Sequence, residues 1–69
     1  MLSTWTIHDK DGGYLGESKA MSAKIAFVIF MSARGRSVNL ADVRVEPLPD
    51  GRTQVTHRGK VHFFKKKDE

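Results

Sequence analysis

The sequence contains no cysteine. Disulfide bonds and cysteine-based zinc sites are therefore excluded, and the composition suits a reducing compartment. A chain of 69 residues buries only about 60% of the surface that its unfolded form exposes. Small domains of this kind often depend on disulfides, a metal ion or a partner chain for further stability. Without disulfides, a well-packed core or a partner chain has to supply that stability.

Long hydrophobic runs are also absent. The longest apolar run extends over seven residues, from Ile25 to Met31, whereas a transmembrane helix needs about 20. The residues before Asp9 contain neither the basic region nor the apolar segment of a signal peptide. We therefore expect a cytoplasmic protein that does not contact a membrane.

Signatures of known catalytic and cofactor sites are missing as well. The sequence has no nucleophile elbow, P-loop, dinucleotide fingerprint or HExxH motif. Asp9 and Asp11 flank a predicted turn, where hydrogen bonds to the nearby backbone explain them. The three histidines, His8, His57 and His62, have neither cysteine nor a suitably spaced carboxylate beside them. We therefore expect no enzymatic activity, no bound metal and no cofactor.

The residues that are present predict one small α+β domain over residues 1–64, followed by a charged, disordered tail over residues 65–69. Residues 5–8 alternate in polarity and predict a strand. Residues 9–13 contain the Asp-Gly and Gly-Gly pairs of a hairpin turn. Residues 14–19 then form the returning strand, in which Gly16 marks a possible bulge.

The central segment predicts a helix. Ser22 suits the N-cap position, Arg34 suits the negative end of the helix dipole, and Gly35 suits the position after the last turn. No glycine or proline interrupts the residues between them. A buried strand is the alternative, since a short apolar run is compatible with both structures.

The rest of the chain predicts three strands. Residues 43–46 alternate in polarity, and Pro47 indicates that this strand ends there or lies at a sheet edge. Residues 47–51 are typical of a turn, and Arg58-Gly59 is a two-residue loop between strands at residues 53–57 and 60–64. The predicted order is ββαβββ, with one helix packed on one face of an antiparallel sheet.

The predicted helix is apolar on both sides. At 100° per residue, one broad face carries Ile25, Ala26, Ile29, Phe30 and Ala33, and we expect this face to contact the sheet. The opposite side carries further large apolar side chains where a surface helix is usually polar. The loop at residues 36–41 or the C-terminal segment could cover them, or they could form an interface with a second copy or another protein. The candidate interface residues are Phe27, Val28 and Met31.

The two faces of the terminal hairpin look alike. Strand alternation places Val55, His57, Lys60, His62 and Phe64 on one face, and leaves Gln54, Thr56, Val61 and Phe63 on the other. Each face has one valine and one phenylalanine, so the pattern does not decide which face is buried. If the first face is exposed, it combines cations with an aromatic ring, as surfaces that bind single-stranded nucleic acid do.

Positive charge is concentrated at the C-terminal end. The net charge is +4, and residues 51–67 contain no acid. This concentration predicts a non-enzymatic binding module for nucleic acid or another polyanion. A tail that only aids solubility is one alternative, and a homodimerisation or protein-interaction module that uses the helix is another. The candidate nucleic-acid-binding residues are Arg52, His57, Arg58, Lys60, His62, Phe64, Lys65, Lys66 and Lys67.

Overall fold

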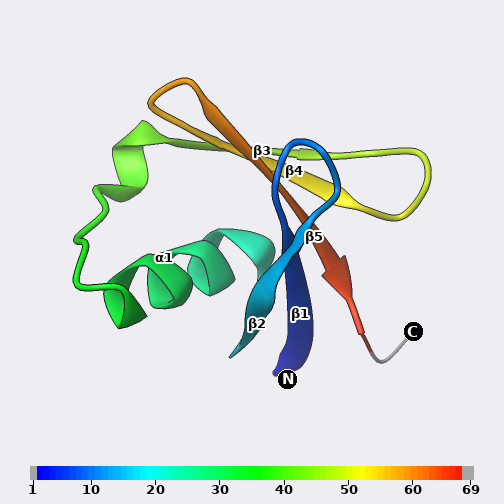
Figure 1. Cartoon of the computed structure of the whole chain (residues 1–69), viewed down its shortest axis with the longest axis horizontal. Helices are drawn as coiled ribbons and strands as arrows, with labels where there is room; N and C mark the ends of the chain where they lie inside the picture. Colours follow the sequence, from blue (N-terminus) through cyan, green and yellow to red (C-terminus); the bar gives the residue numbers. More distant parts are fainter. Residues whose placement is uncertain (1, 68–69) are drawn as a thin grey trace.

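The computed structural model describes residues 2–67 and contains a five-stranded antiparallel sheet with one α-helix on one face (Figure 1). This arrangement confirms the predicted α+β fold and the ββαβββ order. Figure 1 shows a strongly twisted sheet, in which β3 and β4 cross the direction of β1 and β2. The elements are β1 (Ser3–His8), β2 (Tyr14–Ala20), α1 (Ala23–Ala33), the short 3₁₀ helix η1 (Leu40–Asp42), β3 (Val43–Pro47), β4 (Thr53–His57) and β5 (Lys60–Lys66).

The first hairpin forms where the turn residues predict it. The Asp9 carboxylate accepts hydrogen bonds from the backbone N–H groups of Asp11 and Gly13, at 2.9 and 2.8 Å. A bulge follows in β2, because Ile7 pairs with Gly16 while His8 pairs with Tyr14. The predicted turn and the predicted irregularity near Gly16 are both confirmed.

The C-terminal strand lies in the middle of the sheet. The strand order is β2-β1-β5-β4-β3, so β5 pairs with both β1 and β4. Lys65 and Lys66 belong to this strand, paired with Thr6 and Trp5, and the Lys67 N–H donates to the Thr4 carbonyl at 2.8 Å. Pairing with β1 therefore carries the ordered domain past the expected boundary at residue 64 through residue 67. Residues 68–69 of the predicted tail lie outside the described residues.

The helix begins and ends at the predicted residues. The Ser22 hydroxyl accepts a hydrogen bond from the Ile25 N–H at 3.3 Å. At the other end, Gly35 adopts a left-handed φ of 75°, and the Arg36 N–H donates to the Met31 carbonyl at 3.0 Å. This bond and the left-handed Gly35 are the features of a Schellman motif, the common helix ending that favours glycine. The helix is confirmed over the strand alternative.

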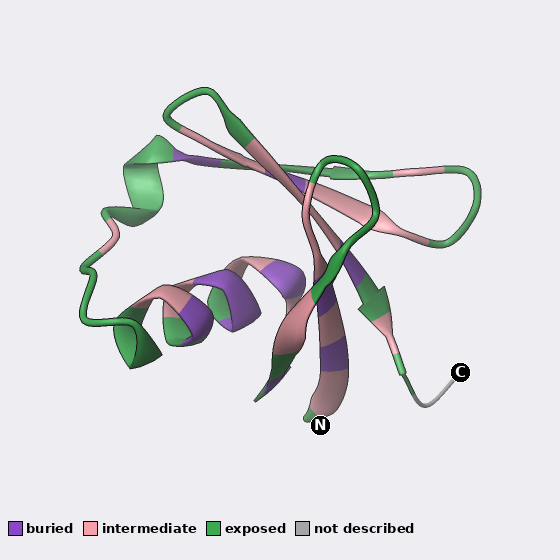
Figure 2. Ribbon diagram, viewed as in Figure 1, coloured by how far each residue is buried: buried purple, intermediate pink, exposed green. Residues whose placement is uncertain are grey.

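The helix is rotated relative to the prediction. Its buried side consists of Ala23, Ala26, Phe27 and Phe30, and Phe27 is only 1% exposed. Of the five residues expected to contact the sheet, Ala26 and Phe30 are buried as predicted, but the prediction is wrong for Ile25 and Ile29, which are 41% and 43% exposed, and for the exposed Ala33. The two small alanines allow the helix to approach the sheet closely, and the two phenylalanines fill the remaining space. Figure 2 shows the buried side of α1 turned toward the strands.

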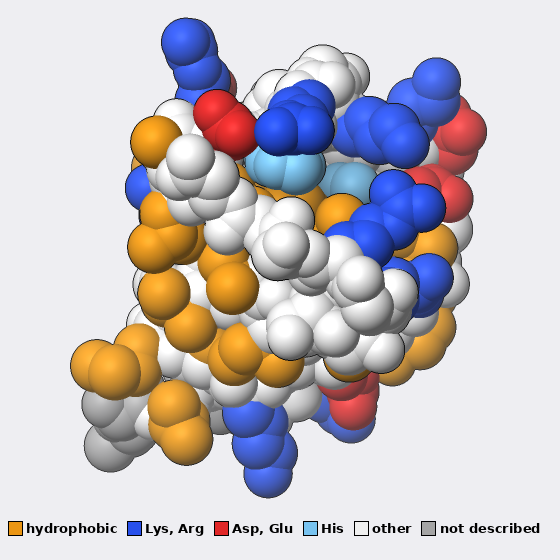
Figure 3. Space-filling view, turned by 90° about the vertical axis from the view of Figure 1, so that its left-hand side faces the viewer, with side chains coloured by type: hydrophobic (Ala, Val, Ile, Leu, Met, Phe, Trp, Pro, Cys, Tyr) orange, Lys and Arg blue, Asp and Glu red, His pale blue; other side chains and the backbone are white. Residues whose placement is uncertain are grey.

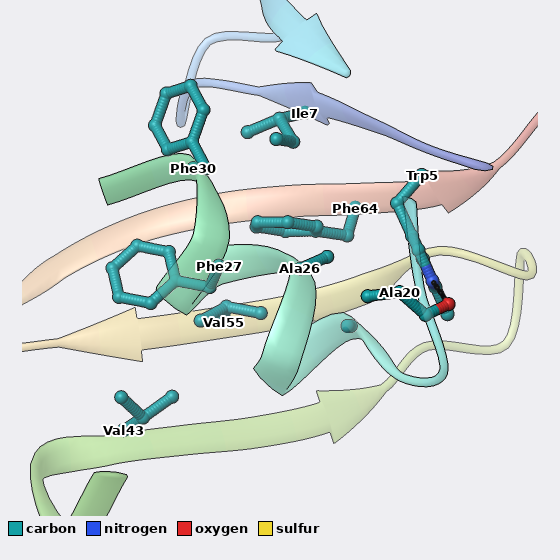
Figure 4. Close-up of a cluster of buried hydrophobic side chains, with 10 residues drawn as sticks. Trp5, Ile7, Ala20, Ala26, Phe27, Phe30, Val43, Val55 and Phe64 are labelled. Atoms are coloured by element: carbon teal, nitrogen blue, oxygen red, sulfur yellow. Dashed lines mark hydrogen bonds between the residues drawn. The ribbon is translucent and has the colours of Figure 1, made fainter. Parts of the chain in front are cut away.

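The core occupies the space between α1 and the sheet (Figure 4). The ring of Phe27 lies 6.3 Å from that of Phe64, centroid to centroid, and the Trp5 indole N–H donates to the Ala20 carbonyl at 3.1 Å. No helix within residues 2–67 is long and apolar enough to cross a membrane. The core residues are Trp5, Ile7, Ala20, Ala23, Ala26, Phe27, Phe30, Val43, Val55 and Phe64.

Candidate anion-binding pocket

The β4–β5 hairpin turns its histidine-bearing face toward the helix. Val55 and Phe64 on this face have no exposed surface, which settles the question that the sequence left open. Phe64 belongs to the core and cannot stack on a nucleic-acid base, so its predicted role in binding is wrong. Val61 and Phe63 lie on the opposite, outer face of the sheet, because successive strand residues alternate.

Beyond the core, the same face borders a cavity of about 350 Å³. Helix α1 and the segment that follows it form one wall, and the tip of the β4–β5 hairpin forms the other. Figure 3 shows histidine side chains in the upper part of this face with Lys and Arg side chains next to them, acidic side chains nearby, and hydrophobic side chains beneath. We call this cavity the basic pocket. Its lining residues are Phe27, Met31, Arg36, Ser37, His57, Arg58, Lys60 and His62.

The Schellman motif brings Arg36 to the pocket. Its bond from the Arg36 N–H to the Met31 carbonyl turns the chain back beside the last helical turn. Arg34, just before the glycine, lies with its guanidinium 4.4 Å from the centre of the Phe30 ring. Arg34 and Arg36 both line an adjoining hollow of about 230 Å³. The cationic wall is therefore a consequence of how the helix ends.

The hairpin loop supplies two further cations. Arg58 and Gly59 both have positive φ, at 50° and 81°, as a two-residue type I′ turn requires. This geometry confirms the predicted loop, in which Arg58 is the first loop residue and Lys60 is the first residue of β5 after it. Arg58 also forms an ion pair with Asp42 at 3.7 Å. A positive φ is uncommon for a residue with a side chain, so the arginine is held at some cost to the backbone.

Two imidazole rings flank Phe27 at the floor of the pocket. The His57 and His62 rings lie 5.4 and 5.5 Å from the Phe27 ring, centroid to centroid. Within residues 2–67, the buried Nδ1 atom of His62 has no hydrogen-bond partner. Burial lowers the pKa of His62 below its usual value, the charges of Lys60, Arg34 and His57 add to this effect, and Asp9 opposes it. His62 is therefore mainly neutral at pH 7.

The electrostatic character of the pocket is positive. Arg36, Arg58 and Lys60 line it, and no acidic residue of the described chain is among its lining residues. Asp42, whose carboxylate pairs with Arg58, is the last residue of the short helix η1. Among residues 2–67, no three histidine or carboxylate side chains converge in a way that could hold a metal ion. The arrangement suits an anion that also carries an apolar or aromatic part.

The other predicted binding residues lie elsewhere. Lys60 and Lys66 stand at opposite ends of β5, about 20 Å apart at the strand rise of 3.3 Å per residue. Arg52 pairs with Asp50 at 2.6 Å and lies over the Phe63 ring on the outer face. The remaining lysines point in different directions: Lys65 is exposed, Lys66 lies 5.5 Å from the centre of the Trp5 ring, and Lys67 contacts Glu17 at 2.8 Å.

The structure thus brings four of the nine predicted residues together, His57, Arg58, Lys60 and His62. The sequence did not predict a binding role for Arg34 and Arg36, because the residues at the helix end were interpreted only as capping signals. The clue was present, since two arginines surround the glycine that reverses the chain.

The predicted helix interface also changes. Phe27 is buried and Met31 is half-buried beside the pocket, so neither is available on the outer side of the helix. Val28 is also half-buried but does not line the basic pocket, and the exposed Ile25 and Ile29 lie beside it on the helix. The apolar outer face of the helix therefore exists, but its members are Ile25, Val28 and Ile29.

Comparisons with protein-family models, curated protein sequences and solved structures find no match to this chain.

Proposed function

We propose that this chain is a non-enzymatic binding module that holds nucleic acid, or a similar phosphate-bearing polyanion, at the basic pocket. The observation that supports this function is that Arg36, Arg58 and Lys60 line one cavity, which no acidic residue among residues 2–67 lines, although Asp42 lies 3.7 Å from Arg58. Cations gathered in a concave site raise the local concentration of anions more strongly than the same charges spread over a surface.

The floor of the pocket favours nucleic acid over a simple inorganic anion. Imidazole rings from His57 and His62 and the Met31 side chain offer apolar and flat surfaces beside the cations. Aromatic side chains, histidine included, are the groups on which proteins stack unpaired bases. The sequence assigned this stacking role to Phe64, whereas the pocket offers the imidazoles instead.

The test is fluorescence anisotropy of labelled single- and double-stranded DNA and RNA at several salt concentrations. A pocket variant combines Arg36→Gln, Arg58→Gln and Lys60→Gln. A control variant combines Lys19→Gln, Arg44→Gln and Lys65→Gln, which removes the same charge from exposed positions outside the pocket. For a single strand, losing three phosphate contacts lowers the slope of log K against log salt by about 2.

The pocket variant should lose affinity and salt dependence, and the control variant should keep most of both. Equal losses in the two variants would show that only the total charge matters. No binding by the wild-type protein at low salt would contradict the proposed function.

A second candidate function, homodimerisation, is favoured by the outer face of α1. Ile25 and Ile29 lie one turn apart there and are 41% and 43% exposed. A two-fold axis would place this apolar stripe against its own copy, as in most homodimers. Analytical ultracentrifugation over the micromolar range would then report a dimer that Ile29→Glu converts to a monomer. A monomeric wild-type protein throughout that range would contradict this candidate.

A further inference from the structure

We infer that the basic pocket takes one unpaired nucleotide of a single strand, with the base on the imidazole floor and the phosphate among Arg36, Arg58 and Lys60. This inference rests on the proposed function and names the ligand of the same site. It depends on three properties of the pocket: its depth, its flat side chains and the position of its cations.

The first property is that the pocket is a hollow rather than a flat surface. Its floor is formed by helix and strand residues, while its arginines come from the loops on either side. A duplex keeps its bases stacked inside and presents its phosphates on the outside, so a paired base cannot reach such a floor. Proteins that read single strands take up unstacked bases in this way. The volume of about 350 Å³ lies at the small end of ligand pockets, which suits one base and not several.

The second property is the fixed position of the two imidazoles. Phe27 is fully packed behind them, with ring centroids 5.4 and 5.5 Å from those of His57 and His62. Phe27 therefore acts as a positioning residue that holds both rings at the floor. Because burial lowers the pKa of His62, this ring is neutral and has one donor and one acceptor nitrogen. Its Nδ1 atom is buried and has no hydrogen-bond partner within residues 2–67, so the ring offers its flat surface rather than this atom to a ligand.

The third property is the separation between floor and cations. Arg58 projects from the hairpin loop with 77% of its side chain exposed, and Arg36 is exposed in the segment after the helix. Both line the pocket, so we place the phosphate beside them, where it would compete with Asp42 for Arg58. One guanidinium group can donate two parallel hydrogen bonds to a phosphate, and a phosphate has enough oxygens to accept bonds from two arginines.

The experiment compares four probes by isothermal titration calorimetry: inorganic phosphate, ribose 5-phosphate, adenosine 5′-monophosphate, and a single-stranded oligonucleotide with its matching duplex as control. Stacking of the base should make the mononucleotide bind about 5- to 150-fold more tightly than ribose 5-phosphate. The single strand should bind more tightly than the duplex at the same salt concentration.

Two variants separate the contacts. Arg58→Gln should weaken all four probes, because it removes a phosphate contact. His57→Ser should remove the preference for the mononucleotide over ribose 5-phosphate while leaving phosphate binding in place. His57→Leu, which keeps an apolar side chain against Phe27 but removes the flat ring, serves the same purpose if His57→Ser does not fold.

The outcomes separate this inference from the proposed function. Equal binding of the mononucleotide and ribose 5-phosphate, or of single strand and duplex, would overturn the inference and leave polyanion binding intact. Failure of every oligonucleotide to bind would overturn both. Loss of the mononucleotide preference in His57→Ser, with the unfolding midpoint unchanged, would support the inference.

Discussion

Truncation of Phe27 should cost far more stability than truncation of Ile29, although both are large apolar residues of the same helix. The sequence pattern assigns Ile29 to the sheet-facing side and Phe27 to the outer side. The structure reverses this assignment, with Phe27 1% and Ile29 43% exposed. A pair of alanine substitutions therefore measures directly which side of the helix is packed.

The expected magnitudes differ by several kcal/mol. Replacing a buried phenylalanine by alanine costs about 3–5 kcal/mol, because contacts are lost and a cavity remains. The total stability of a domain of 69 residues is about 3–10 kcal/mol, so Phe27→Ala should leave a large unfolded fraction. Ile29→Ala should cost about 1 kcal/mol or less, since the side chain is half exposed and alanine is the better helix former.

Urea unfolding provides the assay, with Trp5 fluorescence and helical circular dichroism as two probes. Trp5 is the only tryptophan and is 6% exposed, so it reports on loss of the core. Phe27→Leu, expected to cost about 1 kcal/mol, keeps the comparison measurable if Phe27→Ala does not fold. Repeating the titration at two protein concentrations separates helix packing from dimer formation. An Ile29→Ala cost equal to that of Phe27→Ala would refute the packing described here.

Three further outcomes are expected. Burial lowers the pKa of His62, so as the pH falls below about 6.5 this histidine becomes protonated in the unfolded chain before it does so in the folded chain. The free energy of unfolding should therefore decrease as the pH falls from about 6.5 to the pKa of His62 in the folded chain. His62→Gln should make the urea midpoint less dependent on pH. Gly35→Ala should cost about 1 kcal/mol, because alanine disfavours the φ of 75°; an unchanged thermal midpoint would contradict this. Trp5→Phe should cost about 1 kcal/mol, through loss of the 3.1 Å hydrogen bond to Ala20; circular dichroism measures it, and a stability equal to wild type would speak against the bond.

The order of elements could be predicted from sequence because local chemistry determines most of it. Asp9 and its neighbours form the first turn through hydrogen bonds within five residues, and Ser22 and Gly35 limit the helix in the same local way. The rotation of the helix could not be predicted, because apolar residues surround it on all sides. Its orientation depends on how Phe27 fits against His57, His62 and Phe64, which lie 30 or more positions further along the chain, and a helical pattern contains no information about that fit.

The candidate site shows the same division between local and distant information. His57, Arg58, Lys60 and His62 came together as expected, because a two-residue loop fixes their register. The lysines at residues 65–67 did not join them, since the strand continues and carries them to the far end. The contribution of Arg36 depends on the packing of the helix against the hairpin. That packing was not known from the sequence, and neither was the buried face of the hairpin.

The central position of β5 has a consequence for how the chain folds. Within the described sheet, the hairpin of β1 and β2 and the pair formed by β3 and β4 do not pair with each other; β5 is the strand that pairs with both, while α1 packs against both halves. Thr6 meets Lys65 across 59 positions of sequence, and such distant contacts are slow to form. Until β5 has paired with β1, Ile7 lacks its cross-strand neighbour Phe64, and the core between Trp5 and Phe64 cannot close. A chain at that stage of folding exposes apolar surface, which is the kind of surface that favours aggregation or chaperone binding.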